Sequence, residues 1–186
     1  MRLFVALELS KNARETVSAL QEKIKKVLNC ELKWVLPENL HITLKFLGEI
    51  NPALLPEINS KMAFALNKKR KFKVVLQGLG LFPGMKRPRV LWAGISEGSN
   101  SIVDLIYAIE KSLNSIDIAK DSKKKFPHLT LGRFKNTFDY QSLKALIDNY
   151  HDCYFTDFTA CKIVLYQSIL RPNGPCYKPL NFFNLQ

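Results

Sequence analysis

Two of the three histidines in the chain head the same short pattern, His-x-Thr-Leu. The first copy begins at His41 and carries Thr43, and the second begins at His128 and carries Thr130. Because successive side chains of a β-strand point to opposite faces, the histidine and the threonine of each copy share one face. The aliphatic residues between and after them share the other. Each motif therefore presents an imidazole and a hydroxyl from an apolar backing.

This pair of side chains suits chemistry on a phosphate ester. Phosphodiester hydrolysis needs a base to deprotonate water and an acid to protonate the leaving oxygen, and histidine can do either near neutral pH. Threonine hydroxyls can donate to the non-bridging oxygens, where charge grows in the transition state. A single His-x-Thr is more often an ordinary strand with a partly buried histidine. Two copies in matched contexts favour a shared phosphate site.

A metal site is the weaker interpretation of the same residues. Threonine is a poor metal ligand, and no cluster of Asp, Glu and His accompanies either motif. The third histidine, His151, lies in a sequence typical of an exposed loop. We therefore expect no metal ligands in this chain.

The charge of the chain points to a polyanionic partner. It has 28 Lys and Arg against 16 Asp and Glu, a formal net charge of +12 and an isoelectric point near 9.6. Any single basic run is more often a solvated face, but together the runs lean towards nucleic acid. They are Lys23/Lys25/Lys26, Lys68 to Lys71, Lys86 to Arg89, and Lys123 to Lys125.

Length and composition fit one folded domain over residues 1–186, built from two small lobes. No apolar run approaches the roughly 18 residues of a spanning helix, and the N-terminus lacks a signal-peptide pattern. We expect a cytoplasmic protein with no membrane segment. The four cysteines are scattered without a CxxC pair, so we interpret them as reduced, mostly buried thiols.

Hydrophobic periodicity predicts strand–helix–strand–strand, approximately repeated. Helices are expected after Ser10, Asn51, Ser99 and Asp139, with Ser10, Asn51 and Asp139 as caps. On the first motif strand, Phe46 is expected on the apolar face. The repetition predicts an α+β fold whose two halves share a sheet or pack closely. Strands are expected at 2–9, 32–35, 41–48, 71–82, 89–95, 128–134, 161–170 and 177–183.

Five segments together resemble a known family. They are RLFVAL at the start, WVLPENLHITLKFLGE around the first motif, LGLFPGMKRPRVLWAGI in the middle, FPHLTLGRF around the second motif, and LYQSILRPNGPCY near the end. The chain resembles the two-histidine phosphoesterases, and within them the RNA 2′,3′-cyclic phosphodiesterases of bacteria and archaea, historically called 2′-5′ RNA ligases.

The resemblance implies both a fold and a reaction. The fold is bilobal and pseudo-two-fold, with two antiparallel-sheet/helix lobes and the two motif strands lining a central cleft. The reaction opens an RNA 2′,3′-cyclic phosphate to a 2′-phosphate without ATP or metal. By the same resemblance, His41 protonates the leaving 3′ oxygen and His128 activates water. Weak reverse 2′-5′ joining is implied too, with tRNA fragments among the partners. We expect a monomer.

Three further residues have open roles. The resemblance implies that Arg133 contacts the phosphate, yet strict alternation puts it opposite His128 unless Gly132 permits a bulge. The alternative is an arginine paired elsewhere or reaching into solvent. Phe4 and Phe126 are candidates for stacking on a base, with core packing favoured for each.

Two other functions compete with cyclic phosphodiesterase activity. One is a non-catalytic RNA-binding module, which predicts salt-sensitive binding without turnover. The other is a phosphoesterase for a small cyclic phosphate such as an ADP-ribose derivative, for which the basic surface would be incidental.

Overall fold

The structure, a computed structural model, describes residues 1–28, 30–116, 118, 124–172 and 174–186. Lys123 of the last basic run lies outside these residues. The strands are β1 (Arg2–Glu8), β2 (Cys30–Trp34), β3 (His41–Glu49), β4 (Phe72–Phe82), β5 (Val90–Glu97), β6 (Leu129–Phe138), β7 (Tyr154–Ala160), β8 (Lys162–Arg171) and β9 (Gly174–Asn184). The helices are α1 (Lys11–Val27), α2 (Leu55–Leu66), α3 (Ser99–Leu113) and α4 (Tyr140–Tyr150), with short 3-10 turns at Pro37–Asn39, Pro52–Leu54 and Asn114–Ile116.

The strands form one antiparallel sheet whose order is symmetric about its centre. The order is β7-β4-β5-β6-β3-β1-β8-β9, and β2 pairs with β6 off this path. The motif strands β6 and β3 are central, β5 and β1 flank them, and β4 and β8 come next. In the chain, β1 leads through α1 to β3 as β5 leads through α3 to β6. The predicted repetition is therefore a pseudo-two-fold arrangement within one continuous sheet.

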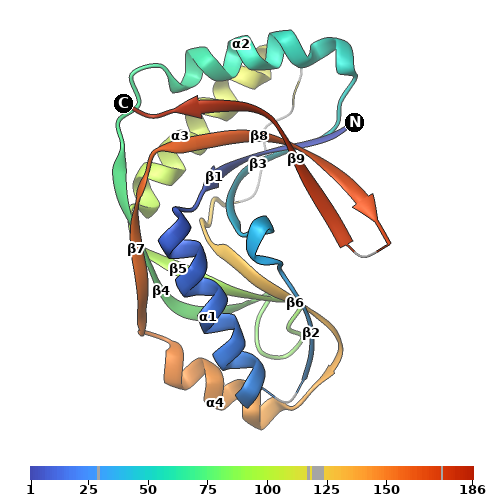
Figure 1. Ribbon diagram of the computed structural model, residues 1–186, viewed down its shortest axis with the longest axis vertical. Coiled ribbons are helices and arrows are strands. Elements are labelled where there is room, and N and C mark those ends of the chain that lie inside the picture. Colours follow the sequence, from blue (N-terminus) through green and yellow to red (C-terminus); the bar gives the residue numbers. More distant parts are fainter. Residues whose placement is uncertain (29, 117, 119–123, 173) are drawn as a thin grey trace.

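The helices cover the sheet in two pairs, one at each end of the molecule. α2 packs on α3, and α1 lies beside α4 (Figure 1). Two of their starts have the predicted caps: Ser10 accepts a hydrogen bond from the Ala13 amide at 3.2 Å, and Asp139 accepts from the Ser142 amide at 2.9 Å. The third helix begins at Ser99 itself. Each apolar stripe is buried, as at Val17 of α1, so the helices bury the apolar side of the sheet.

The two motifs meet at the centre of the sheet. Ile42 of β3 pairs with Leu129 of β6, and both side chains are fully buried. Continued by one residue in each direction, this antiparallel register sets His41 opposite Thr130 and Thr43 opposite His128. The four polar side chains therefore belong to one face, with the core behind them.

Phe46 does not lie on the apolar side, so that prediction was wrong. Between β1 and β3 the register passes from Ala6↔Thr43 to Val5↔Lys45, which makes Leu44 an extra residue in β3. Such a bulge reverses the alternation beyond it. Phe46 is consequently 67% exposed, and Lys45 is buried instead, where it forms an ion pair with Glu110 of α3.

Two other predictions need correction. The strand β7 was not predicted, because the side chains on its buried face are Thr156, Phe158 and Ala160, a weak apolar signal. The cysteines are free, but none is buried: Cys153 and Cys161 are exposed, since both lie at the ends of elements. Within the described residues, no helix is long and apolar enough to cross a membrane.

Candidate active site

Both ring nitrogens of His41 are held by neighbours in its own segment. Nδ1 lies 2.7 Å from the Asn39 carbonyl oxygen, and because a carbonyl only accepts, Nδ1 carries the proton. Nε2 lies 3.1 Å from the Thr43 hydroxyl and accepts from it when the ring is neutral. Asn39 is itself fixed, since its side-chain amide donates to the Pro175 carbonyl at 3.0 Å. The ring is thus fixed with Nε2 turned towards the shared polar face.

His128 has the same tautomer for the same reason. Its Nδ1 lies 2.8 Å from the Phe126 carbonyl oxygen, again two residues upstream, so Nδ1–H donates and Nε2 is the nitrogen available for proton transfer. Each histidine follows a turn that contains proline, Pro37 or Pro127. Sequence reasoning noted these turns but not the carbonyls, because main-chain acceptors leave no sequence signal.

Burial favours the neutral form of both rings. Burial lowers the pKa of His41 to about 4, the hydrogen bond to the Asn39 carbonyl opposes this change, and the charges of His128 and Arg14 add to it. The pKa of His128 is lowered by burial too, with the nearby Arg133 contributing. The effect of His128 on His41 means that the two imidazoles are close enough to interact electrostatically.

Arg133 lies on the same side of the sheet as His128. Strict alternation would place it on the opposite side, but β6 contains a bulge between the two residues. The register with β5 passes from Trp92↔Thr130 to Leu91↔Gly132, so Leu131 is an extra residue. Leu131 is buried, and a Cβ on Gly132 would lie 2.9 Å from Leu32 Cδ2 in the core. Both positions point to the core, and Arg133 returns to the other face.

The charge of Arg133 supports this orientation. It lowers the pKa of His128. Burial raises the pKa of Tyr177, and the charge of Arg133 opposes that change. Tyr177 packs edge-on against His41, with ring centroids 5.3 Å apart. Arg133 is therefore within electrostatic reach of both halves of the site.

Aromatic rings surround each histidine in a similar way. Phe4 lies 5.0 Å from His41 between ring centroids, and Phe82 lies 4.9 Å from His128. Phe4 is only 2% exposed and therefore packed, as favoured from sequence, although its ring neighbours belong to the site, whereas Phe126 is 52% exposed and is not packed in the core. Sequence reasoning missed the other ring neighbours, which come from strands far along the chain: Tyr166, Tyr177, Phe82 and Trp92.

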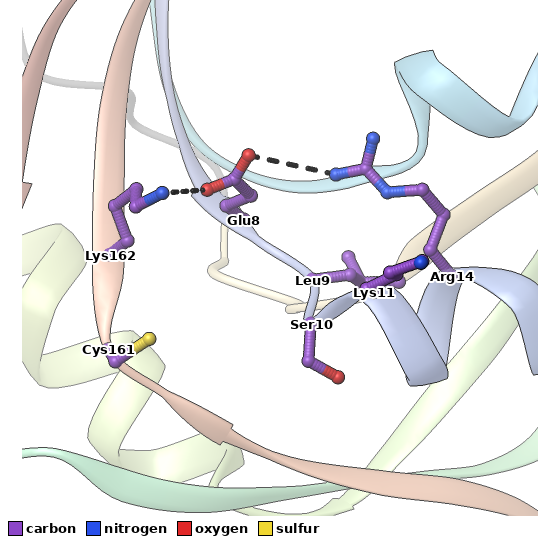
Figure 2. A pocket seen from close by; sticks show the side chains of 7 residues that line it. All are labelled: Glu8, Leu9, Ser10, Lys11, Arg14, Cys161 and Lys162. Atoms are coloured by element: carbon purple, nitrogen blue, oxygen red, sulfur yellow. Dashed lines mark ion pairs between the residues drawn. The ribbon is translucent and has the colours of Figure 1, made fainter.

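A cavity lies beside this site, at the start of α1. Figure 2 shows its lining; its volume is about 430 Å³. Glu8, the register partner of His41, forms ion pairs there with Arg14 at 3.7 Å and Lys162 at 3.0 Å. An anion entering this cavity would compete with the Glu8 carboxylate for both cations. The cavity is therefore a poorer phosphate site than the histidine face. Its lining is Glu8, Leu9, Ser10, Lys11, Arg14, Cys161 and Lys162.

The third histidine lies away from the other two. His151 follows α4, is exposed, and has Nδ1 2.9 Å from the Asp148 carbonyl oxygen, so the prediction of an exposed position is confirmed. Across the described part of the chain, no three His, Cys, Asp or Glu side chains gather in the manner of a metal site.

A family model matches the first half of this chain, and curated relatives match all or nearly all of it. The family model described as LigT like Phosphoesterase matches residues 7–92. A protein of Aquifex aeolicus named RNA 2′,3′-cyclic phosphodiesterase is 37% identical over 189 residues, which cover 100% of this chain and 97% of that protein. A protein of the same name from Methanocaldococcus jannaschii is 37% identical over 179 residues, 96% of this chain and 97% of the other.

Solved structures agree on the fold. The crystal structure of TT0787 of Thermus thermophilus has a TM-score of 0.83 and 27% identity, covering 100% of this chain and 98% of that one. The structure of E. coli LigT complexed with 3′-AMP has a TM-score of 0.78, covering 99% and 97% of the two chains. At 20% identity, the second likeness bears on the fold alone.

Proposed function

Because the chain belongs to the LigT-like phosphoesterase family, together with the RNA 2′,3′-cyclic phosphodiesterases that it matches over its full length, we propose that it hydrolyses RNA 2′,3′-cyclic phosphate ends to 2′-phosphomonoesters. One observation carries the proposal most strongly. The Ile42↔Leu129 register sets two imidazoles of identical tautomer on one face of the sheet, which is what acid–base catalysis at a single phosphorus atom needs.

In the proposed reaction the two histidines act on opposite sides of the phosphorus. His128 Nε2 takes a proton from water as the water oxygen bonds to phosphorus. The bond from phosphorus to the 3′ oxygen breaks in line with this attack, and His41 Nε2–H protonates the leaving 3′ oxygen. The product keeps the phosphate on the 2′ oxygen, and the histidines end with their protons exchanged.

His41 has to take up a proton when the substrate binds. A pKa of about 4 leaves His41 neutral at pH 7 in the free protein. A bound phosphodiester is an anion, and an anion beside the ring favours the imidazolium and raises its pKa. Substrate binding near neutral pH should therefore be accompanied by proton uptake.

Thr43, Thr130 and Arg133 are proposed to hold the phosphate. In the free protein the Thr43 hydroxyl donates to His41 Nε2. Protonation of His41 makes Nε2 a donor and releases that hydroxyl to donate to a non-bridging oxygen. Thr130, opposite His41 in the register, would supply a second donor, and Arg133 would supply positive charge.

The basic composition supports RNA as the substrate. As part of the same proposal, the protein is a cytoplasmic monomer with one domain over residues 1–186 and acts on RNA ends that include tRNA fragments. Weak reverse 2′-5′ joining would use the same site, with a 5′-hydroxyl in place of water. These finer points follow from the family resemblance.

The test is to incubate the purified protein with an RNA that ends in a 2′,3′-cyclic phosphate and to identify the terminal product by mass and by ³¹P NMR. We expect a product that is heavier by one water molecule and carries its phosphate on the 2′ oxygen. The His41→Ala/His128→Ala double variant, prepared in parallel, controls for contaminating nucleases. Binding without turnover would indicate a non-catalytic RNA-binding module. Turnover of a small cyclic phosphate, such as a cyclic phosphate of ADP-ribose, but not of RNA would indicate the small-molecule alternative.

A further inference from the structure

We propose that Lys33 forms a second phosphate subsite, which binds the phosphate joining the terminal nucleotide to the nucleotide before it. This inference rests on the proposed function and narrows its substrate class. The preferred substrate would be an RNA with at least one internucleotide phosphate next to its cyclic end. A mononucleotide 2′,3′-cyclic phosphate would leave the subsite empty.

The sheet register sets the orientation of Lys33. Lys33 of β2 pairs directly with Arg133 of β6, and directly opposed residues of antiparallel strands project on the same face. Arg133 lies on the face of His128, as described above. The preceding residue, Leu32, is 8% exposed and points to the core, so alternation along β2 also turns Lys33 towards the site.

The β8–β9 hairpin gives independent evidence for this orientation. A Cβ built on Gly174 would lie 3.6 Å from Lys33 Nζ, so the ammonium group lies beside the start of β9. The next residue, Pro175, accepts the hydrogen bond from the Asn39 side chain, whose main-chain carbonyl orients His41. Lys33 thus lies beside the β8–β9 hairpin, which also carries Tyr177 against His41.

The pairing of Lys33 with Arg133 sets two positive charges directly opposite each other in the sheet. Like charges directly opposite each other in a sheet destabilise it. Within the described residues neither cation forms an ion pair with a carboxylate, whereas the next cation along β6, Lys135, pairs with Glu31 at 3.9 Å. Two adjacent exposed cations beside the histidines provide more charge than one phosphodiester anion needs. A second phosphate would relieve their repulsion.

The experiment compares two substrates that differ by one nucleotide and therefore by one internucleotide phosphate. They are adenosine 2′,3′-cyclic phosphate and the dinucleotide ApA with a 2′,3′-cyclic end. We expect a higher kcat/KM on the dinucleotide for the unmodified protein. Lys33→Ala should lower kcat/KM about tenfold on the dinucleotide, the size expected for one charge-assisted contact, and less than about twofold on the mononucleotide. Lys33→Arg should retain most of the preference.

A neutral linkage provides the complementary test. A dinucleotide whose internal phosphate is replaced by a methylphosphonate should lose the same factor with the unmodified protein and lose nothing more with Lys33→Ala. Lys111→Ala removes an equal charge from the exposed surface of α3 and should behave like the unmodified protein on every substrate.

The outcomes separate this inference from the proposed function. If the unmodified protein turns over neither substrate, the proposed function fails. If it turns over both but shows no preference for the dinucleotide, or if Lys33→Ala slows both substrates equally, the second phosphate subsite is wrong and the proposed function stands.

Discussion

The two halves of the site share a backbone geometry and differ in what surrounds it. Both histidines donate Nδ1–H to the carbonyl two residues upstream. Beyond that, His41 is packed by Tyr177 of the β8–β9 hairpin and hydrogen-bonded to Thr43. His128 instead has Arg133 nearby because of the bulge in β6. The repeat supplies two equivalent imidazoles, and their different neighbours provide the means for different roles.

The tautomer and the protonation state of each histidine have different causes. The tautomer is set identically by two main-chain carbonyls, so substitution of nearby side chains should not change which nitrogen faces the phosphate. The protonation state depends on burial and on nearby charges, which differ between the halves. Variants that remove one feature from one half should therefore have unequal effects if the roles differ.

The largest effects should come from the histidines themselves. His41→Ala and His128→Ala should each lower kcat on a cyclic RNA end by roughly 10²- to 10⁴-fold, the usual contribution of general acid–base catalysis. The double variant should lose less than the product of the two factors, because the residues act on the same bond changes. Full activity of either single variant would contradict the two-histidine site. Circular dichroism serves as the folding control.

The threonines should show a smaller loss. Thr43→Ala and Thr130→Ala should each reduce kcat on the order of 10²-fold, as for a lost oxyanion donor. Thr43→Ala should also alter the pH dependence of kcat/KM, because the Thr43 hydroxyl is hydrogen-bonded to His41 Nε2 in the free protein. Thr→Ser variants retain the hydroxyl and serve as the matched controls. Equal rates for the alanine variants and the unmodified protein would exclude the proposed phosphate contacts.

Features that depend on local sequence could be predicted, whereas features that depend on pairing between distant strands could not. The motif strands, the helix caps and the repetition were predicted, because alternation, periodicity and capping are local signals. The bulge at Leu44 was not predicted, and a bulge near Gly132 was only one of two open alternatives, since both bulges arise from pairing with β1 and β5. The bulge at Leu131 resolves the orientation of Arg133, and the one at Leu44 explains the exposed Phe46. The aromatic neighbours were missed because they lie on strands distant in sequence.

His41 should also make the fold sensitive to acid. Its pKa is about 4 in the folded protein, below its usual 6.5, so the unfolded chain binds the proton more readily between these values. The free energy of unfolding should therefore fall as pH drops from about 6.5 towards 4, with about 2 kcal/mol lost from this residue by pH 5.

Urea unfolding at pH 7 and pH 5 measures this contribution. His41→Asn keeps a side-chain donor for the Asn39 carbonyl but does not titrate, so it should lose about 2 kcal/mol less than the unmodified protein over the same interval. His151→Asn, at an exposed position, is the matched control. Equal losses in His41→Asn and the unmodified protein would show that His41 is not buried in the neutral form.

Chelation should have no effect on activity. Two imidazoles with hydroxyl and guanidinium donors already provide the acid, the base and the charge stabilisation of the proposed reaction. Turnover of a cyclic RNA end should be the same with and without excess EDTA after dialysis. Loss of activity that a divalent ion restores would require a different mechanism.

The most direct test of the division of labour is the response of each histidine variant to the leaving group. An RNA cyclic phosphate has a poor leaving oxygen that must be protonated, whereas an activated aryl phosphodiester has a good one. If His41 is the acid and His128 the base, His41→Ala should be far less impaired on the aryl ester than on RNA, and His128→Ala should be impaired alike on both. Rescue of His128→Ala instead would reverse the roles, and rescue of neither variant, on an aryl ester that the unmodified protein hydrolyses, would contradict the acid–base assignment.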